Sequence, residues 1–212
     1  MKVAIVCAGA FPRSEYPLLL LKEADSIVCC DGALTTLEKK GIVPDVVTGD
    51  FDSVCRRALK RFPGKVVHIA DQECNDLTKA FRYVMGNYSG LTHIYILGAT
   101  GKSEAHSLGN LSLLMQYEKD YSLCSREISV EMVSDYNTAF AISNDCTLFV
   151  GQGRKVSVFT CDPSLKLRSE GLQWPLDGVE FDNWWKGSLN RASEDSVRLE
   201  FSHPAPVLII LD

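Results

Sequence analysis

The sequence predicts an α/β domain with a mostly parallel sheet and flanking helices, followed by an all-β domain that forms an antiparallel β-sandwich. Up to about residue 123, short continuous apolar runs alternate with amphipathic segments, which is typical of strands buried between helices. From about residue 128 the runs are rich in Val, Ile, Phe and Thr and are separated by turn residues, which favours antiparallel strands. We therefore expect domains at 1–123 and 124–212.

In the first half, apolar runs without polar alternation predict strands that are buried on both faces. They cover residues 3–8, 26–30, 45–48, 65–70 and 93–97. Residues 33–40 predict a helix that ends at Gly41, and residues 76–85 carry one apolar helical stripe. In a parallel sheet, ligands bind at the carboxyl ends of the strands. The polar residues that follow the strands should therefore share one edge of the sheet.

In the second half, six short runs predict the strands of the sandwich. They are residues 128–135, 138–143, 146–151, 155–161, 196–202 and 206–212. The polar, short seam near residues 121–127 indicates that the two domains pack closely.

Composition excludes several classes of protein. A formal net charge of −5 with no long basic run argues against a non-specific nucleic-acid binder. The apolar stretch at the N-terminus is too short to span a membrane, so we expect no membrane partner. Eight cysteines without a C-x-x-C spacing are expected to act as small hydrophobes in a reducing cytoplasm.

The segment VVTGDFDSV, residues 46–54, places two carboxylates after an apolar run. In extended backbone, Asp50 and Asp52 would point the same way, as ligands for a Mg²⁺ ion that neutralises their repulsion. Ser53 could cap a following helix. The alternative is a solvated Asp-rich turn between a strand and a helix.

Two further motifs lie in the first half. Asp76 and Lys79 share one face near a helix N-terminus, as a phosphate site or as an ordinary exposed ion pair. The stretch 98–110 contains Gly-Lys-Ser but is not a P-loop, because residue 96 is Ile where that motif needs glycine. It remains a glycine-rich turn that could let a phosphate approach the backbone. His106 could contact a ligand or cap the helix.

Together these motifs resemble the thiamine pyrophosphokinases over the whole chain. The motifs that carry the resemblance are CDGA (30–33), GDFDS (49–53), DQ-x-x-N-D-x-x-K-A (71–80), GATG (98–101) with His106, Leu108 and Asn110, and GLQWPL (171–176). The resemblance implies an enzyme that moves pyrophosphate from ATP to the hydroxyl of thiamine, giving thiamine diphosphate and AMP. It also implies Mg²⁺ and a homodimer with active sites at the subunit interface.

The resemblance also implies roles for particular residues. It places the catalytic and magnesium-binding carboxylates at Asp31, Asp50, Asp52 and Asp76. It places the nucleotide-binding residues at Gln72, Asn75, Lys79, Gly98, Thr100, His106 and Asn110. Thiamine would be bound by Trp174 and Asn190, with the indole stacked on the heterocycle. The alternative for Trp174 is a residue of the sandwich core.

The chain departs from the family pattern at three positions. Ser103 and Ala105 stand where the family usually has Arg and Asp, and Leu189 stands where it has Ser. These changes remove charge and a hydroxyl, so two other functions stay open. One is a pyrophosphokinase for another heterocyclic alcohol, such as a pterin, and the other is a catalytically weak protein that binds nucleotide or thiamine. Neither the general base nor the metal count follows from the sequence.

Overall fold

The computed structural model describes residues 1–52, 59–60 and 62–212. The chain forms two compact units, which are described separately below. The first contains Met1–Asn110 and Ile128–Asp135, and the second contains Leu111–Glu127 and Tyr136–Asp212. Ser53, the expected helix cap, lies outside the described residues. Among the residues that are described, no helix is both long and apolar enough to cross a membrane.

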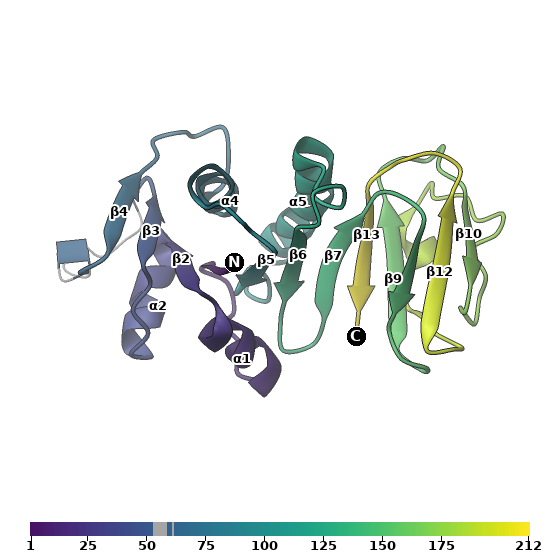
Figure 1. Cartoon of the computed structure of the whole chain (residues 1–212), viewed down its shortest axis with the longest axis horizontal. Coiled ribbons are helices and arrows are strands. Elements are labelled where there is room, and N and C mark those ends of the chain that lie inside the picture. Colours follow the sequence, from purple (N-terminus) through teal and green to yellow (C-terminus); the bar gives the residue numbers. More distant parts are fainter. Residues whose placement is uncertain (53–58, 61) are drawn as a thin grey trace. The chain divides into compact units, whose positions relative to one another are not determined.

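The first unit is built on a parallel sheet, as predicted (Figure 1). Its order is β6-β5-β1-β2-β3-β4, and each of these neighbours pairs in parallel. The strands are β1 (Lys2–Val6), β2 (Ser26–Cys30), β3 (Val46–Gly49), β4 (Lys65–His68), β5 (His93–Leu97) and β6 (Ser129–Val133).

Helices cover both faces of this sheet, with α1 and α2 on one side and α4 on the other (Figure 1). They are α1 (Glu15–Glu23), α2 (Leu34–Lys39) after the 3-10 turn η1 (Asp31–Ala33), and α4 (Asp76–Asn87). A further helix, α5 (Glu104–Tyr121), begins in this unit, and its residues from Leu111 on belong to the second. Leu20 of α1 and Leu37 of α2 share a buried cluster with Val6 and Val47 of the sheet. Helix α2 ends before Gly41, whose φ of +70° suits glycine at that position, as predicted.

Two of the predictions for strands were wrong. The strand expected at 65–70 is not buried on both faces, because β4 is the edge of the sheet and Val66 is exposed. The strand expected at 128–135 is not antiparallel, because β6 pairs in parallel with β5. Its Val and Ile residues, which suggested the second half, occur in parallel and antiparallel strands alike and do not report the direction of pairing. The domain boundary at 123/124 stays a prediction.

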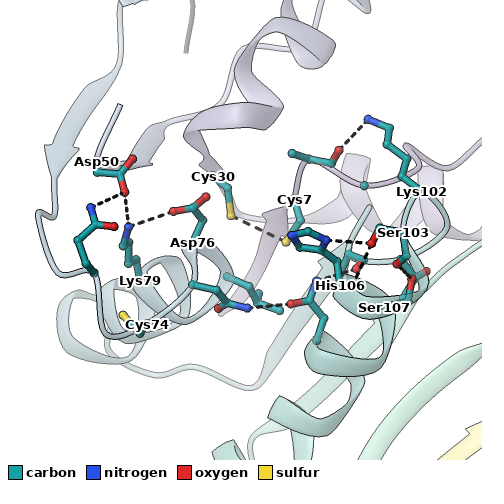
Figure 2. Close-up of a pocket in the computed structure, with 18 residues that line it drawn as sticks. Cys7, Cys30, Asp50, Cys74, Asp76, Lys79, Lys102, Ser103, His106 and Ser107 are labelled. Carbon is teal, nitrogen blue, oxygen red and sulfur yellow. Dashed lines mark hydrogen bonds and ion pairs between the residues drawn. The ribbon is translucent and has the colours of Figure 1, made fainter. Parts of the chain in front are cut away.

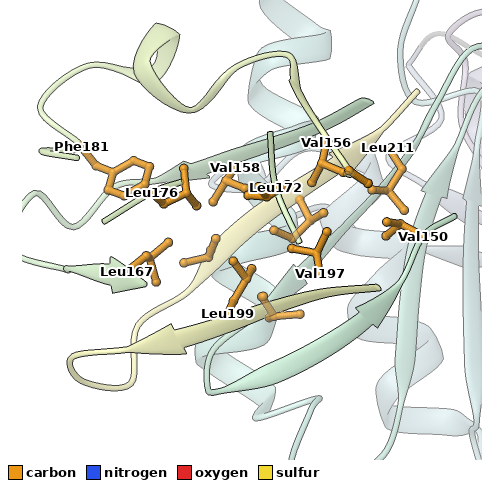
Figure 3. Close-up of a cluster of buried hydrophobic side chains, with 14 of the residues drawn as sticks. Val150, Val156, Val158, Leu167, Leu172, Leu176, Phe181, Val197, Leu199 and Leu211 are labelled. Atoms are coloured by element: carbon orange, nitrogen blue, oxygen red, sulfur yellow. The ribbon is translucent and has the colours of Figure 1, made fainter. Parts of the chain in front are cut away.

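The second unit is an antiparallel sandwich, which confirms the predicted fold class (Figure 3). One sheet has the order β11-β9-β13-β7 and the other β10-β12-β8. The strands are β7 (Thr138–Ile142), β8 (Cys146–Phe149), β9 (Lys155–Thr160), β10 (Leu167–Glu170), β11 (Asn190–Arg191), β12 (Ser196–Phe201) and β13 (Val207–Leu211), with a 3-10 turn η2 (Trp184–Gly187). Val158 of one sheet and Leu167 and Leu199 of the other lie in one fully buried core.

Candidate active site

A cavity of about 510 Å³ lies in the first unit, where the strands end (Figure 2). Its lining comes from the last residue of β2, from the segments that follow β1, β3, β4 and β5, and from the N-terminal turns of α4 and α5. The lining residues are Cys7, Ala8, Gly9, Cys30, Asp50, Gln72, Cys74, Asn75, Asp76, Leu77, Lys79, Ala99, Thr100, Lys102, Ser103, His106, Ser107 and Asn110. The expectation that polar residues after the strands meet at one edge therefore holds for Asp50 and Gln72, whereas Asp31, Asp52 and Gly98 do not line the cavity.

One side of the cavity holds a cluster of charges around Lys79 (Figure 2). The Nζ atom of Lys79 lies 2.8 Å from Oδ2 of Asp50 and 3.2 Å from Oδ1 of Asp76. The side-chain amide of Gln72 also donates to Oδ2 of Asp50, at 3.2 Å. Only 3% of the Lys79 side chain is exposed, so the Asp76–Lys79 pair is not an ordinary surface ion pair.

These contacts shift the pKa of both partners. Burial disfavours the ammonium of Lys79, but its hydrogen bonds to Asp50 and Asp76 outweigh burial and raise its pKa. The bond from Lys79, followed by the backbone N–H of Asp52, lowers the pKa of Asp50. At neutral pH the ammonium of Lys79 and the carboxylate of Asp50 are therefore both ionised.

Asp31 lies behind the cluster and is fully buried. Its carboxylate accepts the backbone N–H of Gly32 and, at 2.9 Å, that of Phe51. Burial, and then the charge of Asp76, raises its pKa. A Cβ atom at Gly49 would lie 2.6 Å from Cγ of Asp31, so only glycine leaves room for this carboxylate.

The sequence argument for Asp52 rested on extended backbone, and that premise was wrong. The φ of Phe51 is +65°, so the chain turns between the two aspartates instead of running straight. Asp52 is exposed, and its backbone N–H contacts Oδ1 of Asp50 at 3.3 Å. Its side chain is not part of the cavity lining.

A chain of amide hydrogen bonds joins the two helices that border the cavity. Asn75 caps α4, because its Oδ1 accepts the N–H of Thr78 at 2.9 Å. Its Nδ2 donates to Oδ1 of Asn110 at 3.0 Å, and Asn110 in turn donates to the carbonyl of Ala99 at 2.7 Å. Both amides therefore fix the position of α4 relative to the glycine turn, in addition to lining the cavity.

The glycine turn at the end of β5 packs against the segment after β1. Gly9 donates to the carbonyl of Gly98 at 2.6 Å, and a Cβ atom at Gly9 would lie 2.4 Å from that oxygen. Gly98 has a φ of +65°. His106 is not the helix cap, since its N–H and its Nδ1 both lie against Oγ of Ser103, at 3.4 and 3.0 Å. Thr100 also lines the cavity.

Sequence reasoning missed part of this lining. Cys7 and Gly9 follow β1, so the rule about strand ends that found Asp31 and Asp50 would have found them as well. Cys30 was quoted only as part of a motif, and its Sγ lies 3.9 Å from that of Cys7. No sequence signal marked Cys74.

The predicted thiamine residues, Trp174 and Asn190, belong to the second unit. The Trp174 side chain is not part of the sandwich core, since the residue is 55% exposed. Asn190 is buried and holds the backbone of Trp174. Its Oδ1 accepts from the Trp174 N–H at 3.2 Å, and its Nδ2 donates to the Trp174 carbonyl at 2.6 Å. Leu189 is 60% exposed and has a φ of +54°.

The donors around Lys79 suit a hard cation that brings its own phosphate ligands. In the part of the chain that the structure describes, no group of three or more His, Cys, Asp or Glu side chains is arranged to hold a metal ion. Mg²⁺, however, commonly takes only one or two protein carboxylates and completes its shell with water and phosphate oxygens. Asp50 and Asp76, which converge on one cation already, fit that requirement.

The amino-acid sequence matches two models of one protein family. The family model described as the thiamin pyrophosphokinase catalytic domain matches residues 18–125. The model for the thiamin pyrophosphokinase substrate-binding domain matches residues 138–205. The chain belongs to the thiamin pyrophosphokinase family. The matched segments include every predicted site residue.

Individual relatives agree with the family. A thiamine pyrophosphokinase of Bacillus subtilis is 35% identical over 120 residues, which is 54% of this chain and 55% of the relative. Thiamine pyrophosphokinase 1 of rice is 24% identical over 171 residues, covering 74% of this chain and 62% of the relative. The matches thus span little more than half the length of these two curated relatives.

Solved structures show the same fold. The crystal structure of Bacillus subtilis thiamine pyrophosphokinase superposes with a TM-score of 0.77 at 20% identity, over 100% of this chain and 99% of that one. A family protein from Enterococcus faecalis gives 0.78 at 18% identity, with 100% and 99% coverage.

Proposed function

We propose that this chain transfers pyrophosphate from ATP to the hydroxyl of thiamine in the presence of Mg²⁺. The observation that carries the proposal is the cluster of Asp50, Asp76 and Lys79 on one side of a cavity in a chain of this family. The thiamine oxygen forms a bond to the β-phosphorus, the bond from that phosphorus to the α,β-bridging oxygen breaks, and AMP leaves. The hydroxyl proton passes to a carboxylate or to water.

The proposed roles follow the contacts. Asp50 and Asp76 would hold Mg²⁺, which neutralises phosphate charge when bound. Asp52 follows Asp50 in the chain but lies outside the cavity lining, and Asp31 holds the backbone of Phe51 in place. Lys79 pairs with both carboxylates and orients them for the phosphates.

Nucleotide binding is proposed for the rest of the cavity. Gln72 and Asn75 border it beside α4, and Thr100, His106 and Asn110 border it beside the turn at Gly98. Since transfer of this kind depends on positioning and charge neutralisation, the amide chain that fixes the two helices serves the reaction directly.

For the acceptor we propose stacking on Trp174, held by Asn190, in a homodimer whose sites combine residues from two copies. The exposed apolar side chains Trp174, Trp185 and Leu189 of the second unit support this. Copies that carry Trp174→Ala and Asp50→Asn can be mixed and the mixed dimers isolated. They should regain one working site, and isolated mixed dimers without activity would contradict a shared site.

We place the reaction in the cytoplasm. All seven cysteines in the described part of the chain carry free thiols, which suits a reducing compartment. Cell fractionation with an antibody against the chain tests this placement.

The decisive experiment incubates the purified chain with ATP, Mg²⁺ and a panel of acceptors, and identifies products by mass. Thiamine should give thiamine diphosphate and AMP in equal amounts. Asp50→Asn should lose this activity, while the matched surface variant Asp120→Asn should keep it. A product with a pterin alcohol and none with thiamine would favour the second function, which the apolar Leu189 beside Asn190 supports. Binding without AMP would leave a non-catalytic protein.

A further inference from the structure

A second lysine lines the cavity, and its surroundings differ from those of Lys79. Figure 2 shows Lys102 and Lys79 on opposite sides of the cavity. The ammonium of Lys79 is bonded to two carboxylates. That of Lys102 contacts the backbone carbonyl of Ala8 at 2.7 Å, and it makes no ion pair among the described residues.

Several backbone N–H groups of the neighbouring loops already have hydrogen-bond partners. Three N–H groups that face one another across these loops are already used. Gly9 donates to the Gly98 carbonyl at 2.6 Å, Ala10 to the Thr100 carbonyl at 2.8 Å, and Gly101 to Oγ of Ser107 at 3.2 Å. A glycine turn that binds phosphate through its backbone needs such groups free. These three groups cannot bind an anion without giving up a bond that they already make, which favours a charged side chain at this end of the cavity.

Lys102 can supply that charge. An ammonium has three N–H donors, and the contact with Ala8 uses one of them. That contact holds the Nζ atom of Lys102 at the cavity, which Gly9 and Ser103 also line. Ser103 has a hydroxyl and no charge. Hydrogen bonds between two charged groups are stronger than those to a neutral group. Lys102, whose partner is a neutral carbonyl, therefore gains more from a phosphate oxygen than Lys79, which already pairs with two carboxylates.

We propose that Lys102 binds a phosphate group of the nucleotide, opposite the cluster of Asp50, Asp76 and Lys79. The inference rests on the function proposed above and adds the residue by which this chain recognises the charge of its donor substrate. On binding, the ammonium keeps or exchanges its bond to Ala8 and directs its remaining N–H groups to phosphate oxygens.

The test is a calorimetric titration of the full chain with ATP and with adenosine, both with Mg²⁺. Lys102→Met should raise the Kd for ATP about 10- to 100-fold, the range of a hydrogen bond to a charged group. It should leave the Kd for adenosine within about twofold. Lys102→Arg, which keeps the charge, should retain most of the affinity. Lys22→Met, a matched change at an exposed lysine of α1, should change neither Kd.

Further readouts separate a phosphate ligand from a structural residue. In steady-state kinetics, Lys102→Met should raise KM for ATP and leave KM for thiamine unchanged. Added KCl should weaken ATP binding by the wild-type chain more than by the variant, because one charge contact has been lost. Equal losses for ATP and adenosine, or an unchanged Kd for ATP, would overturn the role of Lys102.

The same titrations show which proposal fails. If the wild-type chain makes thiamine diphosphate while Lys102→Met binds ATP normally, only the role of Lys102 is wrong. If the wild-type chain binds no ATP and makes no product, the proposed function is wrong, and the inference about Lys102 falls with it.

Discussion

Replacing Asn190 by Ala should destabilise the second unit and weaken acceptor binding, because both depend on the hydrogen bonds of its side chain to the backbone. Asn190 is 6% exposed, and its side chain makes three hydrogen bonds to backbone. They join Oδ1 to the N–H groups of Trp174 and Arg191, at 3.2 and 2.8 Å, and Nδ2 to the Trp174 carbonyl at 2.6 Å. At a net value of about 1 kcal/mol for each bond, their loss should lower the free energy of unfolding by roughly 2–4 kcal/mol.

Urea unfolding followed by tryptophan fluorescence measures this change. Asn144→Ala is the matched control, because Asn144 is exposed and donates only to Oγ of Ser143 at 3.2 Å. Its effect should stay below about 0.5 kcal/mol. At urea concentrations where Asn190→Ala is still folded, its KM for thiamine should rise, since the backbone of Trp174 is no longer fixed. An unfolding free energy within about 0.5 kcal/mol of wild type would refute the reasoning from these three bonds.

Three further predictions concern other parts of the chain. Asp50→Asn should slow product formation by about two to four orders of magnitude in a mass-based assay, because an amide oxygen carries no charge. Circular dichroism should show a normal fold, since the amide oxygen can still accept from Lys79. Near-normal turnover would exclude Asp50 from the mechanism. Thr48→Val should raise the free energy of unfolding by about 1 kcal/mol in urea titrations, because the buried Thr48 hydroxyl has no hydrogen-bond partner among the described residues; a loss of stability would indicate a bound water. The hydrogen bond from His203, followed by bonds from Ser164, lowers the pKa of Asp162 to about 2. The ionised carboxylate therefore stabilises the fold above its ordinary pKa near 4, and this contribution is lost as the pH falls toward 2. In thermal melts, Asp162→Asn should have a lower Tm than wild type at pH 6 and the same Tm near pH 2, and a constant difference across this range would contradict the assignment.

The sequence predicted the fold where the local pattern and the tertiary structure agree. The apolar runs located strands along the first half of the chain, and the runs from residue 138 on form antiparallel strands of the expected sandwich. It failed at β4 and β6, because exposure at a sheet edge and the direction of pairing depend on neighbours distant in the chain. Strand β6 pairs with β5 across the whole length of α5, and no local property of residues 129–133 reports that partner.

The candidate site divides in the same way. Strand ends identified Asp31, Asp50 and Gln72, since the carboxyl ends of parallel strands meet at one edge. The contacts among side chains did not follow from the sequence. The positive φ of Phe51, which redirects Asp52, is stabilised by a hydrogen bond from its N–H to the Asp31 carboxylate, twenty residues earlier. Local propensity alone would not place a non-glycine residue in that conformation.

The charges in the cavity also explain how several carboxylates can lie close together in this fold. Asp50 and Asp76 repel each other, and the charge of Asp76 adds to burial in raising the pKa of Asp31. Lys79, buried on the first turn of α4, neutralises part of this repulsion from within the fold. A lysine bound in this way has little attraction left for a distant phosphate. In the role proposed for Lys102, a second cation on the opposite side of the cavity contributes to recognition of the nucleotide's charge.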